Sequence, residues 1–298
     1  MRAFVMGGTG SIGRAVVREL VQRGHEVIGL ARSQSSATSL QRLGASALAG
    51  DIREPQAWLE GLPEVDGVAH AATDFGDDMG DVDTRLLDKL LPVLGKMRRP
   101  RFVYTGGCWL YGPTGAEPAT EASPFDPLPA FAWMVPNLQR VLEASDVRGL
   151  VVHPAMVYEQ SGGVFSSFIE HARGGGPVLV VGGVHVHWPL VHADDLARLY
   201  ALVLERGEEG QSYNGAALPG LAVSPLALAI AKSFGDADCE VRIVSADEAA
   251  ALRGEWARGY AIDQSMSGEK ARRELDWRPV HLDPIADLVS QAGENGSV

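Results

Sequence analysis

Residues 7–13 read Gly-Gly-Thr-Gly-Ser-Ile-Gly and lie between an apolar run, Arg2–Met6, and an amphipathic run that extends to about Arg23. The apolar run predicts a buried strand, and the amphipathic run predicts a helix. Between a strand and a helix, glycines spaced three apart let the backbone approach a pyrophosphate, which binds the free N–H groups of the helix N-terminus. We therefore expect a dinucleotide-binding loop, rather than a structural turn without a ligand, made of Gly7, Thr9, Gly10, Ser11, Ile12 and Gly13.

Strand and helix patterns go on alternating outward from this loop. Strands are expected at Val27–Leu30, Ala45–Ala49, Val65–Ala69, Phe102–Thr105 and Leu150–His153. Helices are expected at Ser36–Leu43, Pro55–Glu60, about 81–97 and Leu138–Ala144. This order predicts an α/β protein with a Rossmann-type, doubly wound parallel sheet.

The composition changes after residue 158, where glycine-rich turns and shorter elements begin. We predict a dinucleotide-binding domain at residues 1–157, to which a later segment at about 189–215 returns. Residues 158–298 are expected to form mainly a smaller, substrate-binding lobe. The five prolines of residues 112–130 predict a long loop, and long loops in compact domains are often functional.

Composition and charge argue against several classes of protein. With 46% apolar and 21% charged residues, the 298-residue chain can bury a sizeable core and stay in solution. An excess of acidic over basic residues gives a net charge of −12, which argues against nucleic acid and anionic membranes as partners. No apolar run reaches the ~18–20 residues of a membrane span, and the N-terminus lacks the features of a signal peptide. We expect a cytoplasmic protein.

The end of the second expected strand bears on which dinucleotide binds. An NAD-preferring site of this type places an acidic residue there to hold the ribose 2′-hydroxyl. The sequence instead has Ala31-Arg32-Ser33, and Arg32 with Ser33 can bind a 2′-phosphate. NADP(H) is therefore favoured over NAD(H), unless Arg32 is an ordinary solvated arginine.

Further motifs match one family along nearly the whole chain. They are the loop at 7–13 and the segments Gly50-Asp51-Ile52, His70-Ala71-Ala72, Phe102–Thr105 with Tyr111-Gly112, His153–Tyr158, Pro189–Ala197, Ser212–Asn214 and Leu275–Pro279. With them the chain resembles the extended short-chain dehydrogenase/reductases, the NAD-dependent epimerase/dehydratase family. The resemblance implies that Asp51 lies at the adenine and that Ala71 and Ala72 lie against the cofactor. It also implies a homodimer through the helices at about 81–97 and 136–145, and a cofactor site that includes Ile52, Thr105, Pro154 and Val157.

The chain departs from this family where members keep their catalytic residues. Members that transfer hydride to or from an alcohol use a Ser or Thr and a YxxxK pair, in which the Tyr is the acid and base. None of the six tyrosines here is followed by a lysine four positions later. Phe131 and Val135 stand where the Tyr and the Lys are expected, and Gly107 stands at about the position of the Ser or Thr. The chain is therefore identified as an atypical member, which cannot use the usual alcohol chemistry.

Two side chains after the strand Phe102–Thr105 are candidates for a substitute. Tyr111 can act as a proton donor, or it can be the packed structural tyrosine of the family's YG motif. Cys108 can act as a thiol acid or nucleophile, although no cationic neighbour in the sequence favours its thiolate. The alternative is a buried structural cysteine.

Other side chains are candidates for a substrate pocket. Trp109, Phe131 and Trp133 can form its walls or belong to the core. His153 replaces an arginine that many sugar-nucleotide enzymes of the family carry, which argues against a nucleotide-sugar substrate. His187 is expected to point into the same cleft. His185, His187 and His192 form an HxHxxxxH pattern, but ligand types without a geometry indicate little, and we expect no metal.

Three functions fit these observations. The first is an NADP(H)-dependent reductase of a small, hydrophobic carbonyl, enone or imine substrate, because hydride transfer is cofactor chemistry and the protein mainly orients the reactants. The second is a redox sensor similar to the NmrA-like proteins, which binds NADP(H) without turnover. The third is an isomerase or cyclase that keeps the cofactor fold as a scaffold.

Overall fold

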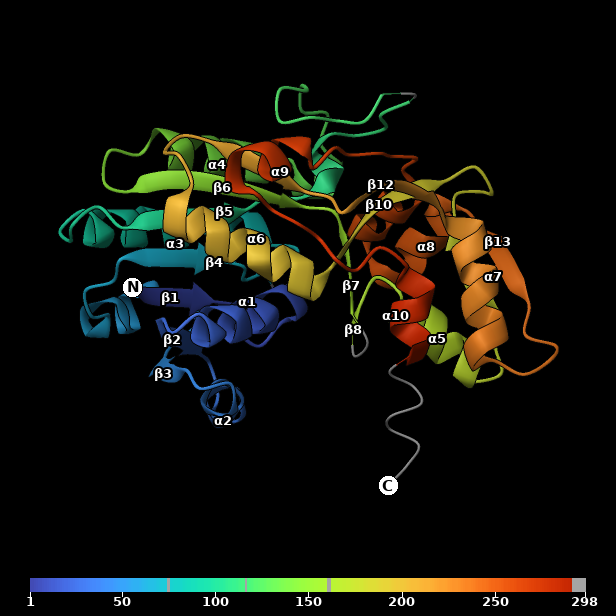
Figure 1. Ribbon diagram of the computed structural model, residues 1–298, viewed down its shortest axis with the longest axis horizontal. Coiled ribbons are helices and arrows are strands. Elements are labelled where there is room, and N and C mark those ends of the chain that lie inside the picture. The colour runs from blue at the N-terminus through green and yellow to red at the C-terminus, as the bar shows by residue number, and fades with distance from the viewer. Residues whose placement is uncertain (74–75, 116, 160–161, 291–298) are drawn as a thin grey trace.

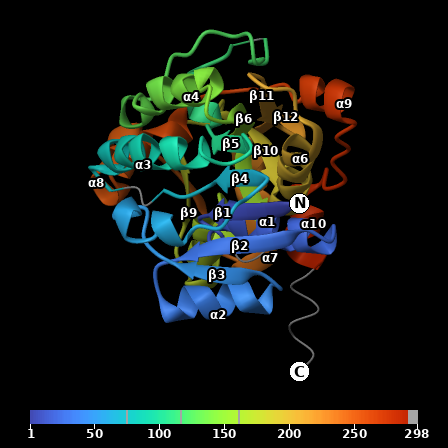
Figure 2. The same ribbon diagram turned by 90° about the vertical axis from the view of Figure 1, so that its left-hand side faces the viewer.

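The computed structural model describes residues 1–73, 76–115, 117–159 and 162–290, and its centre is a parallel sheet of seven strands. From one edge to the other these are β3 (Ser46–Ala49), β2 (Glu26–Ala31), β1 (Arg2–Met6), β4 (Gly67–His70), β5 (Arg101–Thr105), β6 (Arg148–Pro154) and β11 (Ser212–Gly215). Figure 2 shows them stacked in this order. The chain order runs outward in opposite directions from β1 and β4, so a ligand crevice is expected between the carboxyl ends of these two strands.

Helices cover both faces of this sheet (Figure 1). One face carries α1 (Ser11–Gln22) and α6 (Ala193–Arg206), and the other carries α3 (Met79–Leu94) and α4 (Met134–Glu143). Alternate residues of a strand point to opposite faces. In β1, Ala3 and Val5 therefore join one hydrophobic core and Phe4 and Met6 join the other, and all four are fully buried. The apolar strands and the two helix layers explain the doubly wound architecture.

Beyond β6 the chain builds a second group of elements, to the right in Figure 1. A four-stranded sheet has the order β12 (Leu218–Ala222), β10 (His187–His192), β7 (Met156–Glu159) and β8 (Gly162–Gly163), and β9 (Val178–Val181) pairs with β13 (Val241–Val244). The helices of this part are α5 (Ser166–Arg173), α7 (Val223–Phe234), α8 (Ala246–Arg253) and α10 (Pro284–Ser290). Helix α9 (Glu269–Leu275) packs on β11 and α6, and α2 (Gln34–Arg42) packs on β2 and β3.

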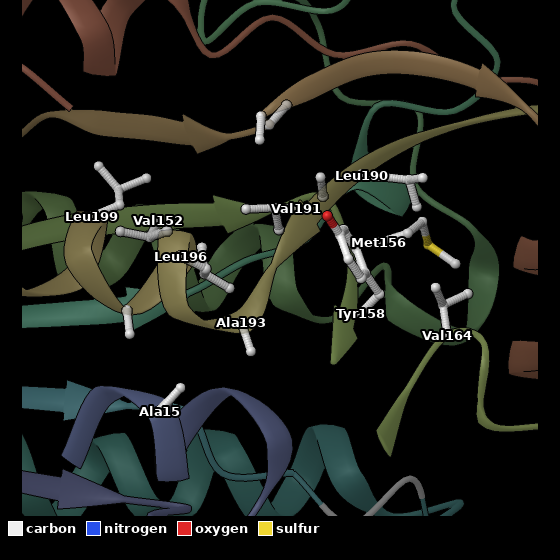
Figure 3. Packing of buried hydrophobic residues seen from close by; sticks show 14 of the residues in the cluster. Ala15, Val152, Met156, Tyr158, Val164, Leu190, Val191, Ala193, Leu196 and Leu199 are labelled. Carbon is white, nitrogen blue, oxygen red and sulfur yellow. The ribbon is translucent and has the colours of Figure 1, made fainter. Parts of the chain in front are cut away.

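One hydrophobic core joins the large sheet to this second group. Figure 3 shows Met156 and Tyr158 of β7 beside Leu190 of β10, with Leu196 of α6 and Ala15 of α1 in the same cluster. One ion pair adds to the joint, from Arg14 of α1 to Glu159 of β7 at 2.8 Å, and Arg18 of α1 pairs with Asp194 at the start of α6, directly after β10. The two parts are thus held together directly behind the glycine loop.

Most of the expected elements are present, and the differences have local causes. The Pro55–Glu60 helix is replaced by two 3₁₀ turns, η1 (Pro55–Ala57) and η2 (Leu59–Gly61), because the segment is too short for a stable α-helix. Helix α4 starts four residues earlier than expected and has Pro136 in its first turn, where its missing N–H leaves no hydrogen bond unmade. Among the described residues, every helix is too short or too polar to span a lipid bilayer.

Candidate functional site

Two adjoining cavities lie at the carboxyl ends of β1, β2, β4, β5 and β6. The polar cavity is lined by Gly7, Thr9, Gly10, Leu30, Arg32, Ser36, Gly50, Asp51 and Ile52. The apolar cavity, of about 230 Å³, is lined by Ile12, His70, Asp83, Tyr104–Leu110, Phe131, Trp133, Met134 and Pro154–Val157. Ala71, Ala72 and Thr73 border both cavities, so the two lie side by side. Their position is the crevice expected from the strand order.

Gly7, Gly10 and Gly13, which are spaced three apart in the loop at 7–13, are glycines for different structural reasons. Gly7 has φ +80°, and a Cβ there would lie 2.4 Å from the Ala71 carbonyl oxygen. A Cβ on Gly13 would lie 2.1 Å from the Gly7 carbonyl oxygen, so this glycine lets α1 pack against the loop. A Cβ on Gly10 meets only that same oxygen, at 3.5 Å, and would otherwise enter the polar cavity. Gly10 therefore keeps open a space that a phosphate group fits.

The start of α1 offers donors to such a group. The first helical hydrogen bond runs from the Arg14 N–H to the Gly10 carbonyl, and no side chain caps the N–H groups of Ser11, Ile12 and Gly13. The first turn of α1 contains no acidic residue. Uncapped N–H groups and the positive end of the helix dipole attract an anion. The loop and the start of the helix thus fit the pyrophosphate of a dinucleotide. Ser11 and Gly13 themselves do not line either cavity.

The far end of the polar cavity contains a basic side chain. Arg32 is exposed there, with no hydrogen bond or ion pair to another described residue. Ser36, which the sequence analysis did not single out, also lines the cavity. The Ser33 hydroxyl instead accepts a hydrogen bond from the Ser36 N–H at 3.2 Å and caps α2. Asp51 completes this end, and its backbone oxygen accepts a hydrogen bond from the Trp58 indole at 2.8 Å.

Aromatic rings from separate segments form the wall of the apolar cavity. Trp109 belongs to η3 (Cys108–Leu110), and its ring centroid lies 5.6 Å from Phe131 of η4 (Pro129–Phe131) and 5.4 Å from Tyr260 of η5 (Glu255–Ala261). Trp133 lines the cavity as well and donates its indole hydrogen to the Ala130 carbonyl at 3.0 Å. Thr105, Pro154 and Val157, expected at the cofactor, line this cavity too.

Tyr111 and Cys108 are both buried, and neither placement favours a reactive role. The Tyr111 hydroxyl donates to Asn214 Oδ1 at 3.0 Å, outside the lining of the apolar cavity, and burial raises the pKa of Tyr111 above its usual value. Cys108 does line the cavity, but burial raises the pKa of its thiol to about 12. A thiol with that pKa supplies almost no thiolate near neutral pH.

The two histidines that we expected at the substrate do not line the apolar cavity. His153 is fully buried behind Gly106, in contact with the rings of Tyr111 and Phe125, and burial lowers its pKa to about 4. His187 is largely exposed, and its Nδ1 lies 3.0 Å from Asp263 Oδ1. Neither residue is part of the lining of the apolar cavity.

A buried polar cluster lines the apolar cavity and was missed in the sequence. His70 Nε2 lies 2.6 Å from Asp83 Oδ1, and Asp83 Oδ2 accepts hydrogen bonds from the Tyr104 hydroxyl at 2.7 Å and from Asn137 Nδ2 at 2.8 Å. His70 and Tyr104 belonged to recognised motifs, but Asp83 and Asn137 did not. Asp83 had its own signal: it falls within the apolar stripe of α3, beside Val82 and one turn from Leu87, where a carboxylate is not expected.

A second histidine cluster lies near the C-terminal segment, outside both cavities. Ligand atoms of His192, Asp194 and His281 lie within 4.8 Å of one another, and the two imidazole rings stack with centroids 3.9 Å apart. Asp194 also pairs with Arg18, and His281 lies 3.0 Å from Asp287. These contacts join β10, α6 and the segment before α10.

Comparisons with known proteins agree with this architecture. The sequence model of the NAD dependent epimerase/dehydratase family matches residues 3–216. The uncharacterized protein C2A9.02 of Schizosaccharomyces pombe is 30% identical over 300 residues, which cover 98% of this chain and 99% of that protein.

Two solved structures give the same picture. The dTDP-glucose 4,6-dehydratase DesIV of Streptomyces venezuelae, a double mutant with NAD and DAU bound, superposes with a TM-score of 0.82 at 23% identity, covering 99% of this chain and 98% of that one. The human epimerase family protein SDR39U1 with NADPH gives a TM-score of 0.79 at 21% identity, covering 98% and 99%. The structural likeness shows the fold, and with the family match it supports a nicotinamide dinucleotide as the cofactor.

Proposed function

Because the chain belongs to the NAD dependent epimerase/dehydratase family, we propose that it is an NADP(H)-dependent reductase of a small, hydrophobic carbonyl, enone or imine compound. One observation carries the proposal: a polar cavity that fits a dinucleotide adjoins an apolar cavity walled by aromatic rings. The volume of the apolar cavity, about 230 Å³, is a little below the ~300–1,000 Å³ of drug-sized ligand sites and suits a small substrate.

The lining of the apolar cavity favours a small apolar substrate over a nucleotide sugar. None of its described lining residues is Lys or Arg, so a diphosphate would find no cationic side chain there. Trp109, Phe131 and Trp133 offer large flat surfaces to an apolar or aromatic molecule instead. A reduced nicotinamide, when bound, supplies hydrogen with its electron pair, and these walls exclude water and orient the substrate.

Arg32 and Ser36 support the choice of NADP(H). Their side chains line the same end of the polar cavity as the N-terminus of α2, where Arg32 has no described carboxylate partner. A 2′-phosphate placed there gains a charge-assisted hydrogen bond from the guanidinium. A ribose 2′-hydroxyl gains less, because no acidic residue follows β2.

One observation favours a sensor that binds NADP(H) without turnover. The positions at which the family carries its Tyr, Lys and Ser or Thr are occupied by Phe131, Val135 and Gly107, which hold no acid or base. A sensor needs only the polar cavity, whereas a reductase also needs a source of protons.

The test begins with a fluorescence titration of the protein with NADPH and NADH side by side. NADPH oxidation is then followed with benzaldehyde, acetophenone, 2-cyclohexenone and 3,4-dihydroisoquinoline. We expect tighter binding of NADPH and turnover of at least one compound. Binding without turnover favours the sensor, and absence of binding removes both and leaves the isomerase or cyclase. The pairing of two copies through α3 and α4 stays a prediction, which the mass in solution tests.

A further inference from the structure

Gly107 lines the apolar cavity at a place where the structure leaves room for a side chain. Apart from the two neighbours of Gly107 in the chain, no described atom lies within 4 Å of the Cβ that another residue would carry there. The backbone is extended, with φ −179° and ψ 160°, and any residue can adopt this conformation. Neither close packing nor an unusual backbone requires a glycine at this position, so the open space itself needs an explanation.

The preceding residue, Gly106, is a glycine for a different reason. A Cβ on Gly106 would lie 2.4 Å from Nδ1 of the buried His153, so packing excludes a side chain there. At Gly107 a side chain would meet no such obstacle and would take up space of the cavity. Of the two adjacent glycines, Gly107 is therefore the one that decides how much room a bound molecule has.

The chain on both sides of Gly107 is held by backbone hydrogen bonds. Before it, the Gly106 N–H donates to the Val152 carbonyl of β6 at 2.8 Å. After it, the Trp109 carbonyl accepts a hydrogen bond from the Leu128 N–H at 3.0 Å. The chain is thus fixed and does not move in to fill the space. Close-packed proteins leave few voids, so a lasting one at a cavity wall indicates a place for a ligand.

The tryptophans of the cavity wall are also held in place, each by a glycine of another segment. A Cβ on Gly259 of η5 would lie 2.5 Å from the Trp109 ring. A Cβ on Gly80 of α3 would lie 2.8 Å from Trp133 Cγ. Both rings therefore pack directly on backbone, and neither comes within 4 Å of a Cβ on Gly107. An apolar molecule that contacts these rings can fill the space beside Gly107 without displacing them.

We propose that Gly107 is a specificity-determining residue of the apolar cavity and that the space beside it takes an apolar group of the substrate. This inference rests on the proposed reductase function and narrows its substrate class. The preferred compound carries a ring for the aromatic wall and a second apolar group for the space beside Gly107, because the gain from burial grows with the apolar area buried. A side chain at position 107 competes with the second group alone, so its effect depends on the size of the substrate.

The test compares three ketones that share one aromatic ring. Acetophenone is the smallest, and isobutyrophenone and 4′-isopropylacetophenone carry an isopropyl group at opposite ends of the molecule. Calorimetric titration of the NADP⁺-bound protein measures their Kd without turnover, because the oxidised cofactor cannot reduce them. We expect wild type to bind at least one of the two larger ketones more tightly than acetophenone.

Gly107→Ala and Gly107→Val should then weaken binding of the preferred larger ketone stepwise. For Gly107→Val we expect a loss of about 10- to 200-fold, the usual effect of a methylene-sized change in an apolar pocket, and a loss of less than about threefold for acetophenone. The NADPH Kd and the Tm should stay near wild type. Gly61→Val is the matched control, at an exposed glycine that lines neither cavity. If Gly107→Val does not fold, Gly107→Ala decides the test.

Several results would overturn the proposal. One is a folded Gly107 variant in which all three ketones bind as in wild type, or in which all three are weakened equally. Another is a loss of NADPH affinity as large as the loss of ketone affinity, which assigns the space to the cofactor. A wild-type protein that binds neither larger ketone more tightly than acetophenone also contradicts it.

The proposal and the reductase function fail differently. A protein that shows the expected size dependence but oxidises no NADPH with these ketones loses the reductase and keeps Gly107 as the residue that sets ligand size. A protein that reduces the ketones, and whose Gly107→Val variant reduces them with the same relative kcat/KM values, keeps the reductase and loses the role of Gly107.

Discussion

The polar and apolar cavities differ in what they are made of. The anion-binding part of the polar cavity is formed by backbone, from a glycine loop and a helix start that lie within about seven consecutive residues, whereas the rest of its lining follows β2, β3 and β4. The apolar cavity is formed by side chains from segments far apart in the chain, among them His70, Trp109, Phe131 and Met156. A site made of local backbone keeps one recognisable motif, whereas a site made of distant side chains can change its chemistry without changing the fold.

The largest effect on cofactor binding is expected at Gly10, because the lack of a side chain there keeps the polar cavity open. Gly10→Val should weaken NADPH binding more than about 1,000-fold, about 4 kcal/mol, because the branched side chain fills the space kept for the pyrophosphate. The Tm should change little, since a Cβ at Gly10 meets no atom closer than 3.5 Å. Titration and thermal unfolding measure both. Gly61→Val is the control, at an exposed glycine whose Cβ would meet only Leu48 at 3.7 Å; retained NADPH binding in Gly10→Val would place the cofactor elsewhere.

Arg32→Ala tests why the polar cavity should bind NADPH more tightly than NADH. We expect NADPH binding to weaken about 10- to 100-fold, because a charge-assisted hydrogen bond contributes about 1.5–3 kcal/mol. NADH binding should change less than about threefold, since NADH lacks the 2′-phosphate. Arg42→Ala, at an exposed arginine of α2 outside the cavity, is the matched control. If NADPH and NADH binding weaken equally, Arg32 does not bind the 2′-phosphate.

His153, which is buried behind Gly106 of the apolar cavity, should make the free energy of unfolding depend on pH. The pKa of His153 falls to about 4 in the folded protein because of burial, against about 6.5 unfolded, so the unfolded state binds more protons between these values. The free energy of unfolding should therefore fall by about 2 kcal/mol from pH 7 to pH 5 through this residue. Urea unfolding of His153→Phe should show that much less pH dependence than wild type. His185→Ala, at an exposed histidine, should leave the pH dependence of the free energy of unfolding as it is in wild type. If the same pH dependence remains in His153→Phe, it comes from other groups.

The smallest effect is expected at Gly107, where the apolar cavity has room. A Cβ there meets no atom within 4 Å, and the backbone is extended, so Gly107→Ser should change the free energy of unfolding by less than about 0.5 kcal/mol. Gly106→Ser is the adjacent control, because its Cβ would lie 2.4 Å from His153 Nδ1 and should cost about 1–3 kcal/mol. Chemical denaturation measures both. Equal losses at the two positions would mean that the cavity is closed at Gly107.

The sequence was sufficient for the fold because the deciding patterns are local. The strand Arg2–Met6, the glycine loop and the helix behind it could be predicted together, since each follows from consecutive residues. Where a short segment depended on its surroundings, as at Pro55–Glu60, the predicted helix was wrong. Turn chemistry and tertiary packing decide such segments, and neither can be read from periodicity.

The apolar cavity was harder to predict because its contacts are not local. His70 and Asp83 are 13 residues apart, on a strand and a helix, and nothing in the spacing says that their side chains meet. Ser36, rather than Ser33, lines the cavity beside Arg32, because the Ser33 hydroxyl is used to cap α2. The roles expected of Tyr111 and Cys108 stay predictions, and their burial shows how chain position alone leaves the direction of a side chain open.

One further contact bears on the order in which the two cavities form during synthesis of the chain. The buried amide of Gln264 donates to the carbonyls of Cys108 and Gly112, both at 2.7 Å, and so holds η3 from a point 156 residues further along the chain. The glycine loop and its helix can form as soon as the first strands leave the ribosome, whereas Trp109 gains its neighbour Tyr260 only near the end of synthesis. Contacts of such high sequence separation close slowly. The aromatic wall of the apolar cavity should therefore close only after Tyr260 and Gln264 have been synthesised, later than the strands and the helix around the glycine loop.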